Sequence, residues 1–271
     1  MNSLFDLKNK VVVITGATGA LASTAAFSLA EAGAKIALLT RNVSNLTDTI
    51  KHIEKHGGIA KGFKADILSE SSLQEVCAEI LDWNGKIDVL LNIAGGNLPG
   101  ATIGIDQTIF DMKMEDFNKV TELNLNGTVL PSLVFGKVMS EQKTGSIINY
   151  SSMATQRIIT RVAGYSAAKS AMENFTKWMA VEMAIKFGDG IRVNAISSGF
   201  FIGKQNRSLL LNDDGTYTDR GNAIIRNTPM GRFGEAEELN GAIHFLSSNA
   251  SKFVTGVVLP VDGGFNAFSG V

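Results

Sequence analysis

Seven short runs of apolar, largely β-branched residues alternate with segments of helical length, and this alternation limits the possible folds more than any other feature. The runs lie at residues 10–16, 35–40, 59–66, 86–95, 145–152, 191–199 and 256–264. Most of them are continuously apolar, which is typical of parallel strands covered on both faces. The pattern between them predicts amphipathic helices at 20–33, 69–83, 115–140 and 163–187. Together they predict a doubly wound α/β fold with a mainly parallel, seven-stranded sheet and helices on both faces.

The sequence shows no internal division. No linker rich in Pro, Gly or Ser interrupts the 271 residues, so we expect one domain spanning 1–271. Residues 200–232 lack a clear period, and a long irregular segment inside a compact domain is usually a lid or a binding loop. We therefore expect a substrate lid at about 200–232.

Composition excludes several classes of function. The formal net charge is −1, which provides no basic surface for nucleic acid or for a membrane. Cys77 is the only cysteine, so an internal disulfide framework is excluded and a reducing compartment is favoured. We see no secretory signal and no apolar run long enough to span a bilayer, and we expect a cytoplasmic protein. We also expect no metal site.

A glycine-bearing turn joins the first predicted strand to the first helix in "VVVITGATGALAST" (11–24). Free backbone N–H groups and the helix dipole make such a turn an anion site, and small residues allow a diphosphate to approach. The alternative is a turn kept for packing alone. The binding residues that we expect here are Gly16, Thr18, Gly19, Ala20 and Leu21.

The second strand ends in "LLTRN", where dinucleotide folds place the group that contacts the adenosine ribose. Thr40 and Arg41 stand there in place of a carboxylate, so nothing would repel a 2′-phosphate. We therefore favour NADP(H) over NAD(H), which stays possible, with Arg41 and Asn42 as contacts. Alternatively, Arg41 is a solvated residue that opens a helix at 43–56.

Tyr165 and Lys169 are four residues apart in the predicted helix, so their side chains should share one face. A phenol with a pKa near 10 is a poor base at neutral pH, and an adjacent positive charge typically lowers such a pKa by about 1–3 units. We therefore expect Lys169 to adjust Tyr165 for proton exchange with an alkoxide.

From about residue 8 to its end the sequence resembles the short-chain dehydrogenases/reductases, which have a Rossmann-like fold. The resemblance rests on "TGATGALA" (15–22), "NIAG" (92–95), Asn124 in "LNLNGT", "INYSSM" (148–153), "YSAAK" (165–169) and "RVNAISSG" (192–199). It implies an NAD(P)-dependent oxidoreductase acting on CH–OH groups. Tyr165 would be the acid/base, and Ser152, preferred over Ser151 for its spacing, would bind the substrate oxygen. Lys169 would also bind the nicotinamide ribose, and Asn124 would anchor a water in a proton relay.

The resemblance implies further cofactor contacts and an assembly. The contacts would come from Asp66, Ile67, Asn92, Ala94, Gly95, Gly199 and Ile202, besides Tyr165 and Lys169. A homotetramer would form through the helices at 115–140 and 163–187. Two positions depart from the family pattern, since Ser198 replaces a proline and Gly203 a threonine.

Four stretches are more narrowly similar to one group within this family, the D-mannonate oxidoreductases, or fructuronate reductases: 92–97, 199–210, 228–239 and 260–271. This resemblance implies interconversion of D-fructuronate and D-mannonate. Such a substrate needs a cation for its carboxylate and polar partners for its hydroxyls. The candidates are Asn97, Ser152, Arg157, Gln205, Asn206 and Arg207. The alternatives are a reductase of another polyol or keto acid, of the 5-ketogluconate or 3-ketoacyl type, and a nucleotide-sensing protein without turnover.

Overall fold

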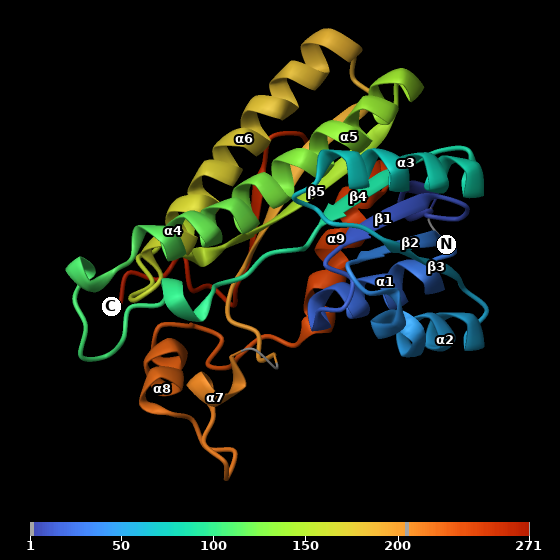
Figure 1. Ribbon diagram of the computed structural model, residues 1–271. Helices are drawn as coiled ribbons and strands as arrows, with labels where there is room; N and C mark the ends of the chain where they lie inside the picture. Colours follow the sequence, from blue (N-terminus) through green and yellow to red (C-terminus); the bar gives the residue numbers. More distant parts are fainter. Residues whose placement is uncertain (1–2, 204–205, 271) are drawn as a thin grey trace.

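The computed structural model describes residues 3–203 and 206–270, and its centre is a seven-stranded sheet (Figure 1). The strand order is β3-β2-β1-β4-β5-β6-β7, and every neighbouring pair runs parallel. The strands are β1 Val11–Thr15, β2 Lys35–Thr40, β3 Ile59–Lys64, β4 Val89–Asn92, β5 Gly145–Ser152, β6 Ile191–Ser198 and β7 Val258–Val261. The predicted doubly wound α/β fold is confirmed, and the strands lie within the predicted runs.

Helices cover both faces of the sheet (Figure 1). One face carries α1 Ala20–Glu31, α2 Thr47–Lys55 and α9 Asn240–Ser247. The other carries α3 Glu70–Asn84, α5 Gly127–Gln142 and α6 Ala163–Phe187, with α4 Met114–Thr121 leading into α5. Short 3-10 turns are η1 Ser3–Phe5, η2 Val43–Leu46, η3 Pro99–Ala101, η4 Ile109–Asp111, η6 Met153–Thr155, η7 Ala236–Leu239 and η8 Asn249–Ser251. Two apolar cores result, one on each side of the sheet.

The strand order reverses between β1 and β4, which are neighbours in the sheet but are separated by two strands in the sequence. In open α/β sheets, ligands bind in the crevice at the carboxyl ends of the strands where the order reverses. The loops after β1, β4, β5 and β6 therefore define the region in which to look for the site.

The helix predicted at 115–140 is not continuous. A π-helical turn, η5 Glu122–Asn126, separates α4 from α5. The carboxamide of the buried Asn124 donates from Nδ2 to the Val120 carbonyl at 2.8 Å, which is the carbonyl that its own N–H would bind in an α-helix. This competition explains the wider turn, and single π turns of this kind occur mostly at functional sites.

The segment at 200–232 is more regular than its sequence indicates, because it forms α7 Arg207–Leu210 and α8 Asp219–Arg226. Leu210, Ile224 and Phe233 make a small apolar cluster separate from the two main cores. Figure 1 shows these helices, in orange, standing apart from the sheet. Local packing within the segment explains its order, and its motion over a substrate stays a prediction.

Within the described ranges no helix is long and apolar enough to cross a bilayer, and no group of three or more His, Cys, Asp or Glu side chains could hold a metal. Cys77 is buried, and burial raises the pKa of its thiol to about 11. A thiol of that pKa is a weak nucleophile near neutral pH.

Candidate active site

The turn between β1 and α1 brings backbone N–H groups to the point where the strand order reverses. Gly16 has a φ of 65°, and a β-carbon there would lie 2.7 Å from the Ala94 Cα after β4. Only glycine satisfies both conditions. Gly19 caps α1 without a side-chain bond, and Thr18, Gly19 and Ala20 are exposed while Leu21 is half-buried. Polar N–H groups at an open helix start suit a diphosphate.

The carboxyl ends of β2 and β3 lie next to the turn after β1 and form the rim of the predicted cofactor site. Arg41 is exposed directly after β2, and the Asn42 carboxamide accepts from the Ser44 N–H at 3.1 Å and so caps η2. Asp66 is exposed after β3 and accepts from the Leu68 N–H at 3.0 Å. Ile67 lies against Gly127, at the start of α5. Arg41 and Asp66 therefore face solvent on the rim.

The expected cofactor contacts after β4 differ in their accessibility. The Ala94 N–H donates to the Thr15 hydroxyl at 3.1 Å, which holds this loop on β1. Asn92, by contrast, is buried, and its Nδ2 donates to Ser132 Oγ and to Asn149 Oδ1, each at 2.9 Å. Its carboxamide lies between the sheet and α5, so a cofactor contact by the Asn92 side chain is not supported, and only its backbone stays a candidate.

Asn124 fixes the glycines after β4. Its Oδ1 accepts from the Gly96 N–H at 2.9 Å, and its Nδ2 donates to the Gly96 carbonyl at 2.8 Å. Gly95, with a φ of 149°, leaves no room for a β-carbon beside Asn124 Oδ1 and lies next to Lys169 Nζ. The Asn124 side chain is therefore a brace for the Gly95–Gly96 loop, and the water that it would anchor stays a prediction.

Ser152, Tyr165 and Lys169 converge at the end of β5. Ser152 Oγ caps η6 and hydrogen-bonds the Tyr165 side chain, whereas Ser151 is buried and donates to Glu173. The choice of Ser152 over Ser151 thus agrees with the direction of each hydroxyl. Lys169 is 3% exposed, its Nζ donates to the Tyr150 carbonyl at 2.7 Å, and it lies 5.8 Å from the centre of the Tyr165 ring.

The expected effect of Lys169 on Tyr165 needs correction. Burial raises the pKa of Tyr165 above its usual value, and the opposing influence comes from the hydrogen bond with Ser152. Burial also lowers the pKa of Lys169 to about 8, although the charge of Glu173 raises it. Loss of hydration disfavours both charged forms, and for Tyr165 it outweighs the nearby ammonium. The two groups share a helix face, as predicted, but burial is the larger influence on the phenol and the net direction of its pKa is upward.

The loop after β6 closes this side of the crevice. Gly199 donates its N–H to the Val261 carbonyl at 2.9 Å, and a β-carbon there would clash with Asp262. Ile202 is 37% exposed and follows in the same loop. Ser198, which replaces the family's proline, lies with its hydroxyl 3.4 Å from the Ser151 carbonyl. Gly199 and Ile202 thus follow the carboxyl end of β6, next to the end of β5, where the nicotinamide is predicted to bind.

Comparison with known proteins agrees with this geometry. A family model described as Enoyl-(Acyl carrier protein) reductase matches residues 16–266. The protein belongs to the short-chain dehydrogenase/reductase family. It is an oxidoreductase that uses a nicotinamide cofactor and acts on CH–OH groups.

Individual members of this family are similar over nearly their whole length. An uncharacterized oxidoreductase of Bacillus subtilis is 44% identical over 275 residues, with 98% of each chain covered. A 2-dehydro-3-deoxy-D-gluconate 5-dehydrogenase of Formosa agariphila is 35% identical over 268 residues, which cover 98% of this chain and 96% of the relative. A Haemophilus influenza structure, provisionally described as a D-mannonate oxidoreductase and solved with bound NAD, is 45% identical with a TM-score of 0.91 and 98% of each chain covered.

In this dehydrogenase/reductase the predicted substrate residues that the structure describes differ in their hydrogen-bond partners. Arg157 donates from Nε and Nη2 to the Asn266 carbonyl at 3.0 and 2.7 Å, and from Nη2 to the Phe268 carbonyl at 2.6 Å. Its guanidinium therefore fastens the C-terminal segment, and its availability for a substrate carboxylate is not supported. The exposed Asn97 donates to the Thr102 hydroxyl.

The lid candidates also differ from one another. Asn206 closes a turn, since its Oδ1 accepts from the Gly203 N–H at 2.8 Å and its Nδ2 donates to the Phe201 carbonyl at 2.9 Å. Arg207 is exposed at the start of α7. Gln205 lies outside the described residues.

Two arginines that the sequence analysis did not select are better placed for an anion. Arg161, in the loop before α6, has a φ of 76° and donates from Nε to the Ile103 carbonyl at 2.6 Å. Arg220, on α8, is half-buried, and in the described part of the protein no hydrogen bond or ion pair involves its guanidinium. Burial and the charge of Arg161 lower the pKa of Arg220. A half-buried cation beside a like charge suggests a place for an anion.

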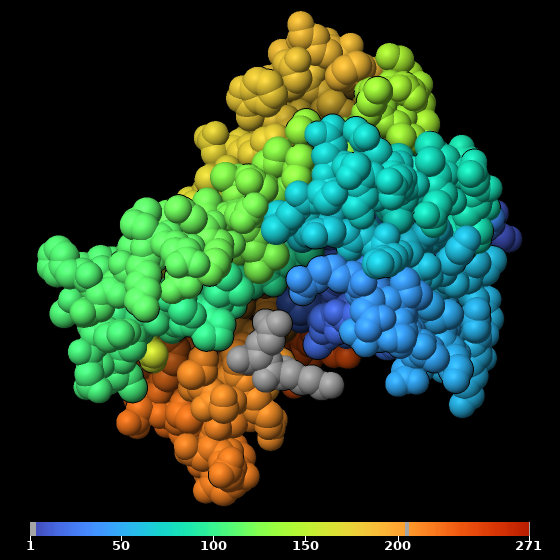
Figure 2. Space-filling model, viewed as in Figure 1, coloured from blue at the N-terminus to red at the C-terminus, as the bar shows by residue number. Residues whose placement is uncertain are grey.

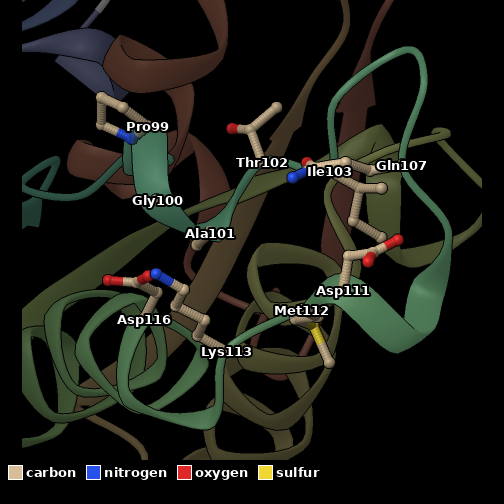
Figure 3. Close-up of a pocket in the computed structure, with 10 residues that line it drawn as sticks. All are labelled: Pro99, Gly100, Ala101, Thr102, Ile103, Gln107, Asp111, Met112, Lys113 and Asp116. Atoms are coloured by element: carbon tan, nitrogen blue, oxygen red, sulfur yellow. The ribbon is translucent and has the colours of Figure 1, made fainter.

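Figure 2 shows a hollow in the surface between the orange segment that contains α7 and α8 and the blue region around α1. The green segment that precedes α5 lies next to this hollow. A pocket of about 210 Å³ is lined by residues between Pro99 and Asp116, from the segment after β4 and the start of α4 (Figure 3). Its lining includes Ile103, Gln107, Lys113 and Asp116 but none of the predicted catalytic side chains. This pocket is therefore not the place of the chemistry, although Ile103 joins it to Arg161.

Proposed function

We propose that the protein interconverts a keto and a hydroxy sugar acid with a nicotinamide cofactor, and that the pair is D-fructuronate and D-mannonate. The observation that supports catalysis most directly is the convergence of the Ser152 hydroxyl, the Tyr165 phenol and the Lys169 ammonium at the end of β5. A protein that only senses nucleotides has no need for this set.

Each of the three groups has a role that follows from its chemistry. The nicotinamide supplies or accepts the hydride when it is bound. Ser152 donates a hydrogen bond to the substrate oxygen, and Tyr165 exchanges the proton that this oxygen gains or loses. Because burial raises the pKa of Tyr165, the phenol is protonated at neutral pH and acts as the acid for carbonyl reduction. Lys169, charged below a pKa of about 8, stabilises negative charge that develops on the phenol oxygen.

The substrate carboxylate is proposed to lie between Arg161 and Arg220. A planar guanidinium binds a carboxylate with two parallel hydrogen bonds. The guanidinium of Arg220 is half-buried and has no ion pair among the described residues, so a bound anion would offset its loss of hydration. Arg207 is a further candidate at the exposed start of α7. A 3-ketoacyl substrate is less compatible with this pair, because an acyl group would leave both cations without an anionic partner.

The cofactor preference proposed is NADP(H) over NAD(H), with NAD(H) accepted. Support comes from Arg41, which is exposed beyond β2 where many NAD sites have a carboxylate. The related Haemophilus structure, which was solved with NAD, is the reason to test both cofactors rather than one.

We also propose a homotetramer in the cytoplasm. Leu133 on α5 and Trp178, Val181 and Ile185 on α6 expose between 54% and 71% of their surface, which gives the two long helices an apolar outer face. The mass in solution, measured by light scattering, tests the assembly.

A substrate panel with both cofactors tests the function. Following the absorbance of the reduced nicotinamide, we expect turnover of D-fructuronate to exceed that of 5-ketogluconate, a 3-ketoacyl thioester and the neutral ketose D-fructose. Faster turnover of 5-ketogluconate would move the assignment to another polyol acid. Cofactor binding without turnover of any carbonyl compound would favour the nucleotide-sensing alternative.

A further inference from the structure

Glu173 is a buried carboxylate without a role in the catalysis proposed above. It lies on α6 one turn beyond Lys169 and is 9% exposed. Its Oε1 accepts from Ser151 Oγ at 2.5 Å and lies 2.8 Å from Thr155 Oγ1. Buried carboxylates are costly unless they are bonded or paired, so a specific use for this one is expected.

The two hydroxyls bound by Glu173 stand on either side of Ser152. Ser151 precedes it at the end of β5, and Thr155 follows it in η6, where its hydroxyl is also 2.9 Å from the Ser152 carbonyl. Ser152 comes from β5, whereas Tyr165 and Lys169 come from α6. Glu173 therefore connects, through one oxygen, the element that holds the serine with the helix that holds the other two groups.

Glu173 also influences Lys169 by its charge. Around Lys169 the other titratable group on α6 is Tyr165, whose phenol is neutral at pH 7 because burial raises its pKa. From β5, Tyr150 offers its carbonyl, while its ring packs in the core on the other side of the sheet. Gly95 and Asn124, which come from other elements and lie near Lys169 in the described structure, are uncharged. The charge of Glu173 opposes the burial that would otherwise discharge Lys169.

We propose that Glu173 is a positioning residue for proton transfer: it fixes the Ser152 segment against α6 and keeps the Lys169 ammonium charged. The inference rests on the roles proposed above for Ser152, Tyr165 and Lys169, but not on which sugar acid is reduced. Glu173 itself contacts neither substrate nor cofactor in this scheme.

Glu173→Gln tests the charge, because glutamine keeps an acceptor oxygen for both hydroxyls. The rate of carbonyl reduction falls at high pH when Lys169 loses its proton. This fall is the alkaline limb of the pH–rate profile, and without the carboxylate it should move to lower pH by about one unit. Glu182→Gln, which removes a carboxylate from the same helix more than three turns from Lys169, should leave the limb in place. An unchanged limb in Glu173→Gln would overturn the charge role.

A double variant, Ser151→Ala with Thr155→Val, tests the positioning and leaves the Glu173 side chain in place. We expect kcat to fall by about tenfold with KM for the cofactor nearly unchanged, since the hydrogen bonds from both hydroxyls to Glu173 are lost. A kcat equal to that of the wild type would show that the Ser152 segment needs no such support.

The side-chain ¹³Cε signal of Lys169, titrated by NMR, gives a readout independent of turnover. Its midpoint should fall in Glu173→Gln and not in Glu182→Gln. If Glu173→Gln does not fold, Glu173→Asp retains the charge and should titrate close to the wild type while lowering kcat. A wild type that reduces no carbonyl compound would reject the proposed function, whereas an unmoved Lys169 midpoint would reject this inference alone.

Discussion

Lys169 Nζ lies 5.8 Å from the centre of the Tyr165 ring, one helical turn away, and both side chains are held at the end of β5. Burial raises the pKa of the phenol, and the hydrogen bond with Ser152 opposes that rise. The pair places a protonated phenol beside a cation whose pKa is about 8. A protonated phenol is the form that can donate a proton when a carbonyl is reduced.

Tyr165→Phe should lower kcat by about 10²- to 10⁴-fold, because the proton donor is removed. Cofactor affinity, measured by fluorescence of the reduced nicotinamide, should change little. The matched control is Tyr217→Phe, since Tyr217, between α7 and α8, packs edge-on against Phe233 and is not among the groups assigned to proton transfer. A Tyr165→Phe protein working at full rate would end the proposed mechanism.

The burial of Lys169 predicts how stability varies with pH. Its pKa is about 8 in the folded protein and 10.5 when unperturbed, so between these values the unfolded state binds more protons. Stability should therefore rise with pH over this window, and below pH 8 the burial penalty is fully present. Relative to Lys169→Met, the wild-type unfolding free energy should increase by about 3 kcal/mol from pH 8 to 10.5.

Chemical denaturation of both proteins at several pH values measures this difference. Lys177→Met, which replaces an exposed lysine on the same helix, is the control and should follow the wild type at every pH. Parallel curves for the wild type and Lys169→Met would contradict the assigned pKa.

Gly16→Ala should abolish tight cofactor binding. The new β-carbon would meet the Ala94 backbone at 2.7 Å and would hold an L residue at a φ of 65°. Gly57→Ala has a similar φ of 80° but nothing within 4 Å, so it separates backbone strain from the clash. Backbone strain should cost each variant about 1–2 kcal/mol of stability, and Gly16→Ala should lose more because of the clash. Only Gly16→Ala should raise the cofactor Kd, by about tenfold or more, in a calorimetric titration.

Arg220→Met should raise KM for D-fructuronate by about 10- to 100-fold, the effect of losing a hydrogen bond to a charged group. A neutral ketose should be affected little. Arg226→Met removes an exposed arginine from the same helix and is the control. Equal losses on charged and neutral substrates would remove Arg220 from the carboxylate site without affecting the assignment of the catalytic groups.

Arg41→Ala should weaken NADPH much more than NADH, because the 2′-phosphate loses its cation. The preference for NADPH, measured as the ratio of the NADH Kd to the NADPH Kd, should fall by about tenfold, whereas Lys51→Ala, an exposed cation on α2, should leave it unchanged. An unaltered ratio in Arg41→Ala would mean that the residue is only solvated.

Patterns over short distances in the sequence led to reliable expectations. The apolar runs marked the strands, and the four-residue spacing of Tyr165 and Lys169 put them on one face of α6, since the direction of each side chain follows the helical period. The interruption at Asn124 was missed, because a carboxamide competing for a backbone carbonyl leaves no trace in hydrophobic periodicity. The order within 200–232 was missed because its helices are too short to show a period.

The amino-acid order alone therefore determined the helices and strands and the reacting side chains that they carry. The tertiary structure decided which of the charged groups are available to a ligand. Arg157 binds carbonyls 109 and 111 residues away, while Arg220 has no partner among the described residues. It also decided that burial raises the pKa of Tyr165 and that Glu173 reaches Ser151. The physical reason is that hydration and hydrogen bonding depend on neighbours brought together by packing, whereas helix and strand periods depend on neighbours in the sequence.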